Sequence, residues 1–170
     1  MVGAGLLALL VLAAPTPASG PPSPLAGKGA FIAISVADLD ATERWYVEKF
    51  DLNRVMAPPV RDGRAMRLLE GRGLIVELIK DPDARALKTL TPSVRRDYLV
   101  HGIFKGGIFV ADFAAAMARL KARGVPIAIG PFPATAEQRA NAIIRDNEGN
   151  FLQIIGDYPA APAGGAKPTD

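Results

Sequence analysis

Residues 31–41 read FIAISVADLDA, and residues 105–115 read KGGIFVADFAA. Each stretch contains an alternating apolar segment typical of a strand, followed by Val-Ala-Asp and the beginning of a helix. After each helix come about three further strand-like segments, so the same β-α-β-β-β pattern occurs twice. One such module leaves one face of its sheet bare, and two modules can enclose a cavity between their bare faces. We therefore predict an α+β fold in which two βαβββ modules pack around a shared cavity.

The first helix has a recognisable beginning and end in the sequence. DATE at residues 40–43 has the form of a capping box, which predicts Asp40 as the N-cap of a helix that runs to about Phe50. The strands expected after this helix include RAMRLL and LIVELI, and those expected in the second module are VPIAIG, ANAIIR and FLQII.

Composition places the chain among ordinary folded domains. It has 170 residues, a formal net charge of +3 and 22% charged residues. Basic and acidic side chains alternate along the chain, and no run of Lys and Arg is interleaved with aromatic residues, so we expect no nucleic-acid partner. There is no cysteine, which excludes a disulfide bond and a lipid anchor attached through cysteine.

The N-terminal region indicates export. The first twenty residues carry no charged side chain, and their apolar run is too short to cross a bilayer but suits a secretory signal. We predict a periplasmic or secreted protein with no stable membrane anchor after signal cleavage; the alternative is an apolar tail on a cytosolic protein. The predicted segments are a signal peptide at 1–20, a linker at 21–26, a folded domain at 27–158 and a disordered tail at 159–170. Within the domain we expect module one at about 27–80, a connector at 81–100 and module two at 101–158.

The order and spacing of these motifs resemble the vicinal oxygen chelate superfamily, which includes glyoxalase I, extradiol dioxygenases and bleomycin and fosfomycin resistance proteins. FIAISVADLDATERWYVEKFDL is similar to the opening strand and helix of that family. GLIVELI is similar to the fourth strand of its first module, and DNEGNFLQII to the hairpin that closes its second. The resemblance implies the glyoxalase/bleomycin resistance/dioxygenase fold.

Metal-using members of that family hold a divalent ion with inward-facing side chains from four strands. Carried over to this chain, those positions are Phe31, Glu77, Lys105 and Gln153. The register is supported internally, because Phe31 and Lys105 each stand five residues before a Val and seven before an Asp. Phe has no donor atom, Lys coordinates only when deprotonated, and Gln offers one neutral carbonyl oxygen. The resemblance therefore implies a degenerate metal site, and we expect neither a metal nor another cofactor.

The same positions predict a binding site for a small organic molecule. Glu77 and Lys105 are expected to face one volume, where Lys105 would hold a carboxylate, enolate or phenolate oxygen and Glu77 would be available as a base. Phe31 and Phe109 would be apolar walls, and Ser35 and Gln153 would orient polar atoms. His101 would lie at the mouth of the cavity if the strand of Lys105 extends back to it. Arg95 and Arg96, in the connector, have two interpretations: they steer anionic ligands or, as we favour, they form a solvated loop face.

Three functions remain open at this point. The first is an exported, metal-free protein that binds a small, anionic organic molecule; Lys105 and the basic connector argue against a cationic guest. The alternative is a lyase, isomerase or dioxygenase-type enzyme, either metal-independent with Lys105 and Glu77 as catalytic residues or with a metal bound in another register. The third is a degenerate domain used for protein contacts, with a homodimer of the kind in which members of the family complete or cover their sites.

Overall fold

The computed structural model of this chain describes residues 29–96 and 99–157. The predicted signal peptide, linker and C-terminal tail lie outside the described residues. Among the described residues, no helix has the length and apolar character that a membrane span requires. The helices and strands are β1 (Ala30–Ser35), α1 (Leu39–Phe50), β2 (Asn53–Met56), β3 (Ala65–Gly71), β4 (Leu74–Lys80), α2 (Leu87–Leu90), β5 (Lys105–Phe109), α3 (Phe113–Ala122), β6 (Ile127–Phe132), β7 (Asn141–Arg145) and β8 (Phe151–Ile155).

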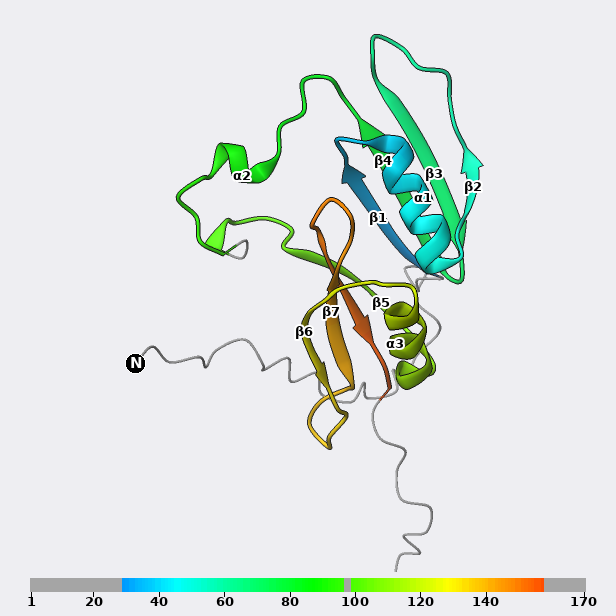
Figure 1. The fold of residues 1–170 in the computed structure, drawn as a ribbon, viewed down its shortest axis with the longest axis vertical. Helices are drawn as coiled ribbons and strands as arrows, with labels where there is room; N and C mark the ends of the chain where they lie inside the picture. The colour runs from blue at the N-terminus through cyan, green and yellow to red at the C-terminus, as the bar shows by residue number, and fades with distance from the viewer. Residues whose placement is uncertain (1–28, 97–98, 158–170) are drawn as a thin grey trace, which may run out of the picture.

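Each half of the chain builds one four-stranded sheet (Figure 1). The strand orders are β1-β4-β3-β2 and β5-β8-β7-β6, so the two sheets have the same topology. The first and last strands of each module pair in parallel, β1 with β4 and β5 with β8, whereas the other neighbours are antiparallel. The predicted α+β fold with two βαβββ modules is confirmed.

The long helices of the two modules begin in the same way. Asp38 and Asp112 are the N-caps of α1 and α3, and each carboxylate accepts a 2.9 Å hydrogen bond from the backbone N–H three residues later. The prediction that Asp40 caps α1 is wrong, because the helix begins at Leu39 and Asp40 lies in its first turn. The repeated Val-Ala-Asp therefore marks the end of a strand and the cap of the next helix.

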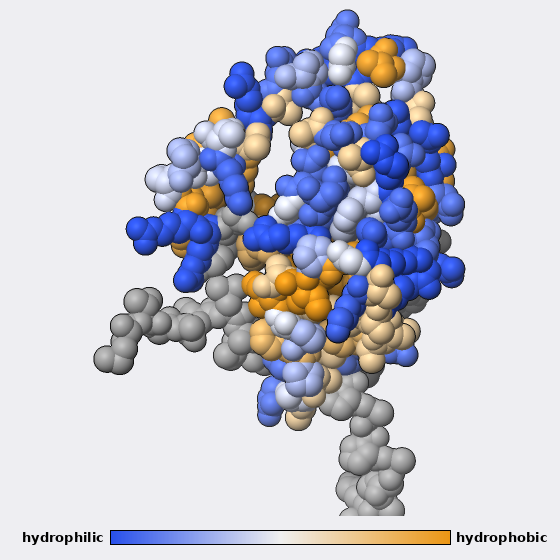
Figure 2. Space-filling view, in the orientation of Figure 1, coloured by the Kyte–Doolittle hydropathy of each residue, from blue (hydrophilic) through white to orange (hydrophobic). Residues whose placement is uncertain are grey.

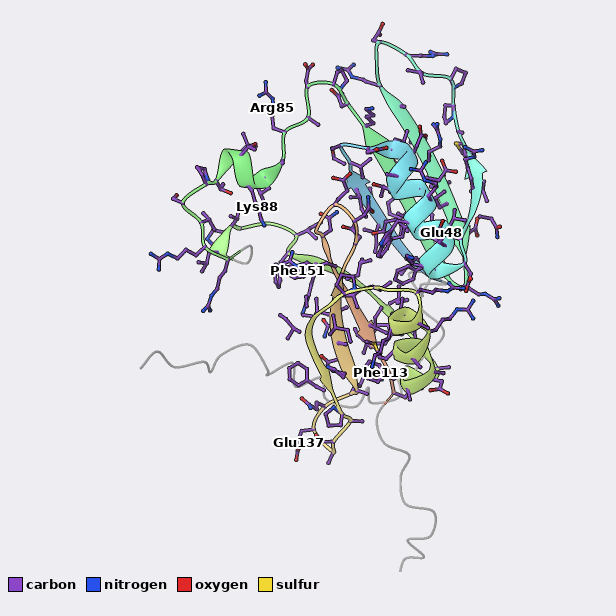
Figure 3. All side chains as sticks on the ribbon, in the orientation of Figure 1. Glu48, Arg85, Lys88, Phe113, Glu137 and Phe151 are labelled. Carbon is purple, nitrogen blue, oxygen red and sulfur yellow. The ribbon has the colours of Figure 1, made fainter. Side chains whose placement is uncertain are left out.

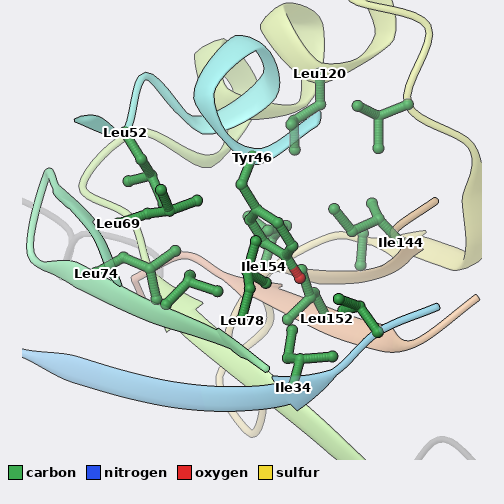
Figure 4. Close-up of a cluster of buried hydrophobic side chains, with 14 of the residues drawn as sticks. Ile34, Tyr46, Leu52, Leu69, Leu74, Leu78, Leu120, Ile144, Leu152 and Ile154 are labelled. Carbon is green, nitrogen blue, oxygen red and sulfur yellow. The ribbon is translucent and has the colours of Figure 1, made fainter. Parts of the chain in front are cut away.

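The two modules share one hydrophobic core (Figure 4). Tyr46 of α1 is fully buried, and its hydroxyl donates a 3.0 Å hydrogen bond to Asp146 in the turn between β7 and β8. Side chains of both modules form one buried cluster around it, among them Ile34, Leu52, Leu78, Leu120, Ile144, Leu152 and Ile154. The helix of the first module therefore helps to complete the core of the second.

Polar contacts join α1 to the second module at both of its ends. At the N-terminal end, the Glu148 carboxylate accepts hydrogen bonds of 3.2 Å from the backbone N–H groups of the two residues before α1. At the C-terminal end, the Asp51 carboxylate pairs with Arg119 at 2.6 Å and with Arg123 at 2.8 Å. These contacts fix the orientation of one module against the other.

The edges of the two sheets meet at β1 and β5. A Cβ atom on Gly106 of β5 would lie 2.8 Å from Cδ1 of Ile32 in β1, which is closer than real Cβ atoms approach. Glycine at this position therefore allows the first strands of the two modules to lie next to each other.

Candidate ligand-binding site

The residues predicted from the family positions lie on the sheet faces opposite the shared core, where Phe31 is exposed, Glu77 and Lys105 are half-buried and Gln153 is buried. Glu77 pairs with Ala33 in the first sheet, and Gln153 pairs with Gly107 in the second, so the two side chains hold equivalent places. The strand neighbours of these residues, Val76, Leu78, Leu152 and Ile154, are buried in the core on the opposite face. The register read from the repeat, with Phe31 equivalent to Lys105, is present in the structure.

The donor atoms at these positions do not fit a divalent metal ion. Glu77 is the only carboxylate of the four residues, and the Gln153 amide donates a hydrogen bond of 3.2 Å to Oδ1 of Asn141. Within residues 29–96 and 99–157, no group of three or more His, Cys, Asp and Glu side chains is arranged to hold a metal. One carboxylate with one amide is too small an oxygen donor set for the metals that this family uses.

Glu77 and Lys105, which are expected to face one volume, do not form an ion pair with each other in the structure. Among the ion pairs of the described residues, none includes either side chain. Lys105 is half-buried, and this burial lowers the pKa of its amine below the usual range because desolvation disfavours the charged form. Its Nζ atom lies 5.9 Å from the centre of the Phe104 ring. Lys105 is thus a desolvated cation beside an aromatic ring.

The predicted apolar walls are open to solvent. Phe31 is 60% exposed and Phe109 is 68% exposed, and Ser35 is also exposed. The guanidinium of Arg139 lies 5.6 Å from the centre of the Phe109 ring. Within one copy of the chain, these side chains border an uncovered sheet face and do not enclose a ligand.

His101 was expected at the mouth of the cavity only if the strand of Lys105 extended back to it, and this condition is not met. β5 begins at Lys105, so His101 lies in the connector and is not part of the strand. Its side chain is exposed. The strand does not extend back to His101, and strand alternation therefore gives no reason to place this side chain at the mouth of a site.

A cavity of about 470 Å³ lies between the connector and the second sheet, and we call it the connector cavity. It is lined by Lys88, Thr91, Pro92, Val94, Arg95, Arg96, Phe104, Ile129, Arg145 and Phe151. Four of these described lining residues are basic and none is acidic. In Figure 3, Lys88 on α2 and Phe151 in the second sheet mark the connector side and the sheet side of this region. The volume lies within the roughly 300–1,000 Å³ range of small-molecule pockets.

The sheet side of the connector cavity is rigidly built. The Arg145 guanidinium stacks on the Phe151 ring at 3.9 Å from the ring centre, and its Nη1 donates a 2.7 Å hydrogen bond to the carbonyl of Gly149. The Phe104 and Phe151 rings meet edge to face, with centroids 5.2 Å apart. A cation and two aromatic rings are therefore held in place before any ligand arrives.

None of the predicted ligand-binding residues lines this cavity, although Lys105 pairs with the lining residue Phe151. Arg95 and Arg96 were interpreted from the sequence as a solvated face, and the structure places both on the cavity wall. The signal that could have found the site is the basic character of the connector. The space-filling view shows hydrophilic side chains along this segment and an opening between it and the first module (Figure 2).

The structure is an α+β fold of two βαβββ modules, with a basic cavity between the connector and the second sheet. Residues 29–154 match the model of the Glyoxalase/Bleomycin resistance protein/Dioxygenase superfamily, and the chain belongs to this family. A comparison with curated proteins gave no match.

Three solved structures resemble the structure of this chain over most of their own length. An antibiotic binding protein from Streptomyces sp. CB03234 is 19% identical with a TM-score of 0.53, covering 76% of this chain and 95% of that one. TioX from Micromonospora sp. ML1 is 18% identical with a TM-score of 0.55, covering 76% and 98%. A glyoxylase/bleomycin resistance protein/dioxygenase domain from Frankia sp. EAN1pec is 18% identical with a TM-score of 0.57, covering 74% and 94%. At identities of 18% and 19%, the similarity to these three structures shows that this chain has the same fold.

Proposed function

We propose that the protein binds a small organic anion without converting it, and that the ligand occupies the connector cavity. The observation that carries the proposal is the lining of this cavity, where four basic side chains converge beside Phe104, Phe151 and Ile129. Five of the ten described lining residues are apolar and four are basic, so the cavity combines apolar surface with charged groups that could orient an anion. The poor metal-donor set at Phe31, Glu77, Lys105 and Gln153 supports a site that works without a resident ion. One solved structure of the same fold is described as an antibiotic binding protein, which supports binding as the function.

The test is ligand-induced stabilisation combined with recovery of the ligand. We expect organic anions to raise the melting temperature, since a ligand at 100 times its Kd stabilises the folded state by about 2.7 kcal/mol. The shift should persist in a strong chelator, and mass spectrometry should recover the ligand unchanged.

Two variants test whether the ligand raises the melting temperature by binding in the connector cavity. Lys88→Gln/Arg95→Gln removes two cations from the connector cavity and should reduce the shift. Arg85→Gln removes one basic residue of the same connector that does not line the cavity, and should retain the shift. Conversion of the ligand, or a shift that disappears with the chelator, would contradict the proposal.

A second candidate function is a metal-independent lyase or isomerase that uses Lys105 and Glu77. The lowered pKa of the Lys105 amine favours it, because desolvated lysines with perturbed pKa values often occur at catalytic sites. Under this alternative, Lys105→Met abolishes turnover of a substrate while the melting temperature stays close to that of the wild type. Turnover that survives in Lys105→Met excludes Lys105 as the catalytic residue.

We also propose that the protein is exported, from the uncharged apolar segment within residues 1–20. Fractionation of cells that express the full chain should recover the protein outside the cytoplasm. N-terminal sequencing of that protein should begin after Ala18 or close to it. A cytoplasmic protein that retains residues 1–20 would contradict export.

A further inference from the structure

We infer that the amine of Lys105 binds an aromatic aldehyde covalently and reversibly, as an imine. The inference goes beyond the proposed function, because Lys105 does not line the connector cavity and the covalent bond requires no charge on the ligand. It is drawn from the place of Lys105 at the edge of that cavity, from the aromatic rings beside it, and from the absence of an ion-pair partner among the described residues.

Lys105 lies on the sheet face that borders the connector cavity. It is the first residue of β5 and pairs with Phe151 of β8, which in turn pairs with Arg145 of β7 (Figure 3). Paired residues of neighbouring strands project from the same face of a sheet, so these three side chains share one face. Phe151 and Arg145 line the cavity, and so does Phe104, the residue before Lys105. The strand partner and the chain neighbour of Lys105 therefore both belong to the cavity wall.

The amine of Lys105 has an aromatic neighbour. Its Nζ atom lies 5.9 Å from the centre of the Phe104 ring, and this ring meets the Phe151 ring edge to face with centroids 5.2 Å apart. Among the described residues, no ion pair includes Lys105. Partial burial disfavours the ammonium form, in agreement with the lowered pKa of this amine. A neutral amine has the free electron pair that attacks a carbonyl carbon.

The other lysines of the described residues have different surroundings. The exposed ones are Lys80, Lys88 and Lys121. Lys49 is half-buried like Lys105, but its Nζ atom lies 3.8 Å from the carboxylate of Glu48. Lys105 is therefore the described lysine that combines partial burial with no ion-pair partner.

Formation of the imine needs no further reactant. The electron pair of Nζ attacks the aldehyde carbon, the two protons of the neutral amine move to the aldehyde oxygen, and this oxygen leaves as water. Addition of water reverses the reaction and returns the amine and the aldehyde unchanged, so the bond is a mode of binding. The rings of Phe104 and Phe151 give an aromatic body contact in offset or edge-to-face geometry, which favours an aromatic over an alkyl aldehyde.

The test is reductive trapping on the wild-type protein. Benzaldehyde is the probe, and sodium cyanoborohydride reduces each imine to a stable secondary amine, which peptide mapping by mass spectrometry assigns to individual lysines. We expect the adduct to form about tenfold faster at Lys105 than at the exposed Lys80 and Lys121. With propanal, which lacks the ring, this preference should fall to about twofold. Unfolding in guanidinium chloride should remove the preference for Lys105 with both probes.

Variants assign the preference to the rings beside Lys105. Phe151→Leu removes one of these rings and should reduce the preference of benzaldehyde for Lys105 from about tenfold to about threefold. Phe132→Leu alters another half-buried ring of the same sheet that does not line the cavity, and should keep the tenfold preference.

Lys105→Arg separates the covalent bond from the positive charge. The variant keeps a cation but cannot form an imine. Benzaldehyde without the reductant should therefore raise the melting temperature of the wild type and not that of Lys105→Arg, whereas benzoate should shift both proteins alike.

Each outcome has a definite meaning. Equal rates at Lys105 and at the exposed lysines of the folded wild type would overturn the inference, and equal preference with benzaldehyde and propanal would overturn the aromatic requirement. A loss in Phe132→Leu as large as in Phe151→Leu would contradict the role of the neighbouring rings. Stabilisation by organic anions is measured separately, so its absence would overturn the proposed function and leave the imine standing. The comparison of probes needs only the wild-type protein, so it stands even where a variant does not fold.

Discussion

At the scale of single residues, the most constrained polar group is the buried carboxylate of Asp146. It accepts hydrogen bonds from the Tyr46 hydroxyl at 3.0 Å, from the backbone N–H groups of Glu148 and Asn150, and from the Asn150 amide. Burial and the neighbouring carboxylate raise the pKa of the Tyr46 hydroxyl far above its usual range, so it remains a donor at every ordinary pH. This hydrogen bond is one of several that connect the helix of one module to the last turn of the other.

We therefore expect Tyr46→Phe to destabilise the protein. Hydrogen bonds to charged groups contribute about 1.5–3 kcal/mol, and the partner left behind here is buried. Chemical denaturation of the wild type and the variant measures the loss. A double-mutant cycle with Asp146→Asn isolates the coupling between the two side chains, and additive effects of the two changes would contradict a direct interaction.

At the scale of elements, the two equivalent helix caps provide a matched comparison. Asp38→Ala and Asp112→Ala each remove a hydrogen bond of the same length and should each cost about 0.5–2 kcal/mol. Glu148→Ala should be additive with Asp112→Ala but not with Asp38→Ala, because the Glu148 carboxylate accepts its hydrogen bonds at the beginning of α1. Chemical denaturation of the single and double variants measures how far their effects on stability add. Equal coupling of Glu148→Ala to both cap variants would contradict the claim that Glu148 acts at the beginning of α1.

The ion pairs of Asp51, at the C-terminal end of α1, predict that the stability of the protein depends on pH. Hydrogen bonds and charge from Arg123 and Arg119 hold the pKa of the Asp51 carboxyl below its usual range. A carboxyl with a lower pKa in the folded state stabilises that state above its unfolded pKa of 3.8, and this contribution is lost as the pH falls through the folded pKa. The group is partly exposed, so the contribution should be less than about 1 kcal/mol.

Asp51→Asn is a suitable variant for this test, since Asp51 has a φ of 55° and Asn tolerates that left-handed conformation. The difference in stability between wild type and variant should be present at neutral pH and shrink below pH 3.8. Denaturation curves measured across this range give the comparison. A difference that does not change with pH would show that the ion pairs contribute nothing.

At the scale of the whole molecule, the bare sheet faces leave apolar side chains uncovered. Phe31 and Phe109 belong to the neighbouring strands β1 and β5 and are 60% and 68% exposed. The homodimer left open by the sequence would cover this surface with a second copy. We expect the melting temperature to rise with protein concentration, and Phe31→Ser/Phe109→Ser to remove that dependence. Sedimentation that gives one monomeric species at all concentrations would exclude this dimer.

The two βαβββ modules could be predicted from the sequence because the patterns that specify their strands, helices and turns are local. Alternating apolar residues, a capping Asp and glycine-containing turns each act within a few positions, and the chain contains them twice in the same order. The family resemblance assigned Glu77 and Gln153 to the last strands of the two modules, and the structure pairs them with equivalent positions of β1 and β5. The cap was assigned two residues late because Asp40 with Glu43 has the same pattern as a capping box, and only the backbone geometry distinguishes it from Asp38.

The connector cavity is a property of the tertiary structure. Lys88 and Arg95 approach Arg145 and Phe151 because the segment between β4 and β5 returns across the second sheet. That segment has no hydrophobic period, and only the short helix α2 interrupts it, so nothing in its local pattern predicts what it packs against. The sequence by itself determined the two modules, their helices and the faces of their strands. Which side chains meet in the cavity was decided only by long-range packing, since contacts between residues far apart in the chain depend on how the modules and the connector assemble.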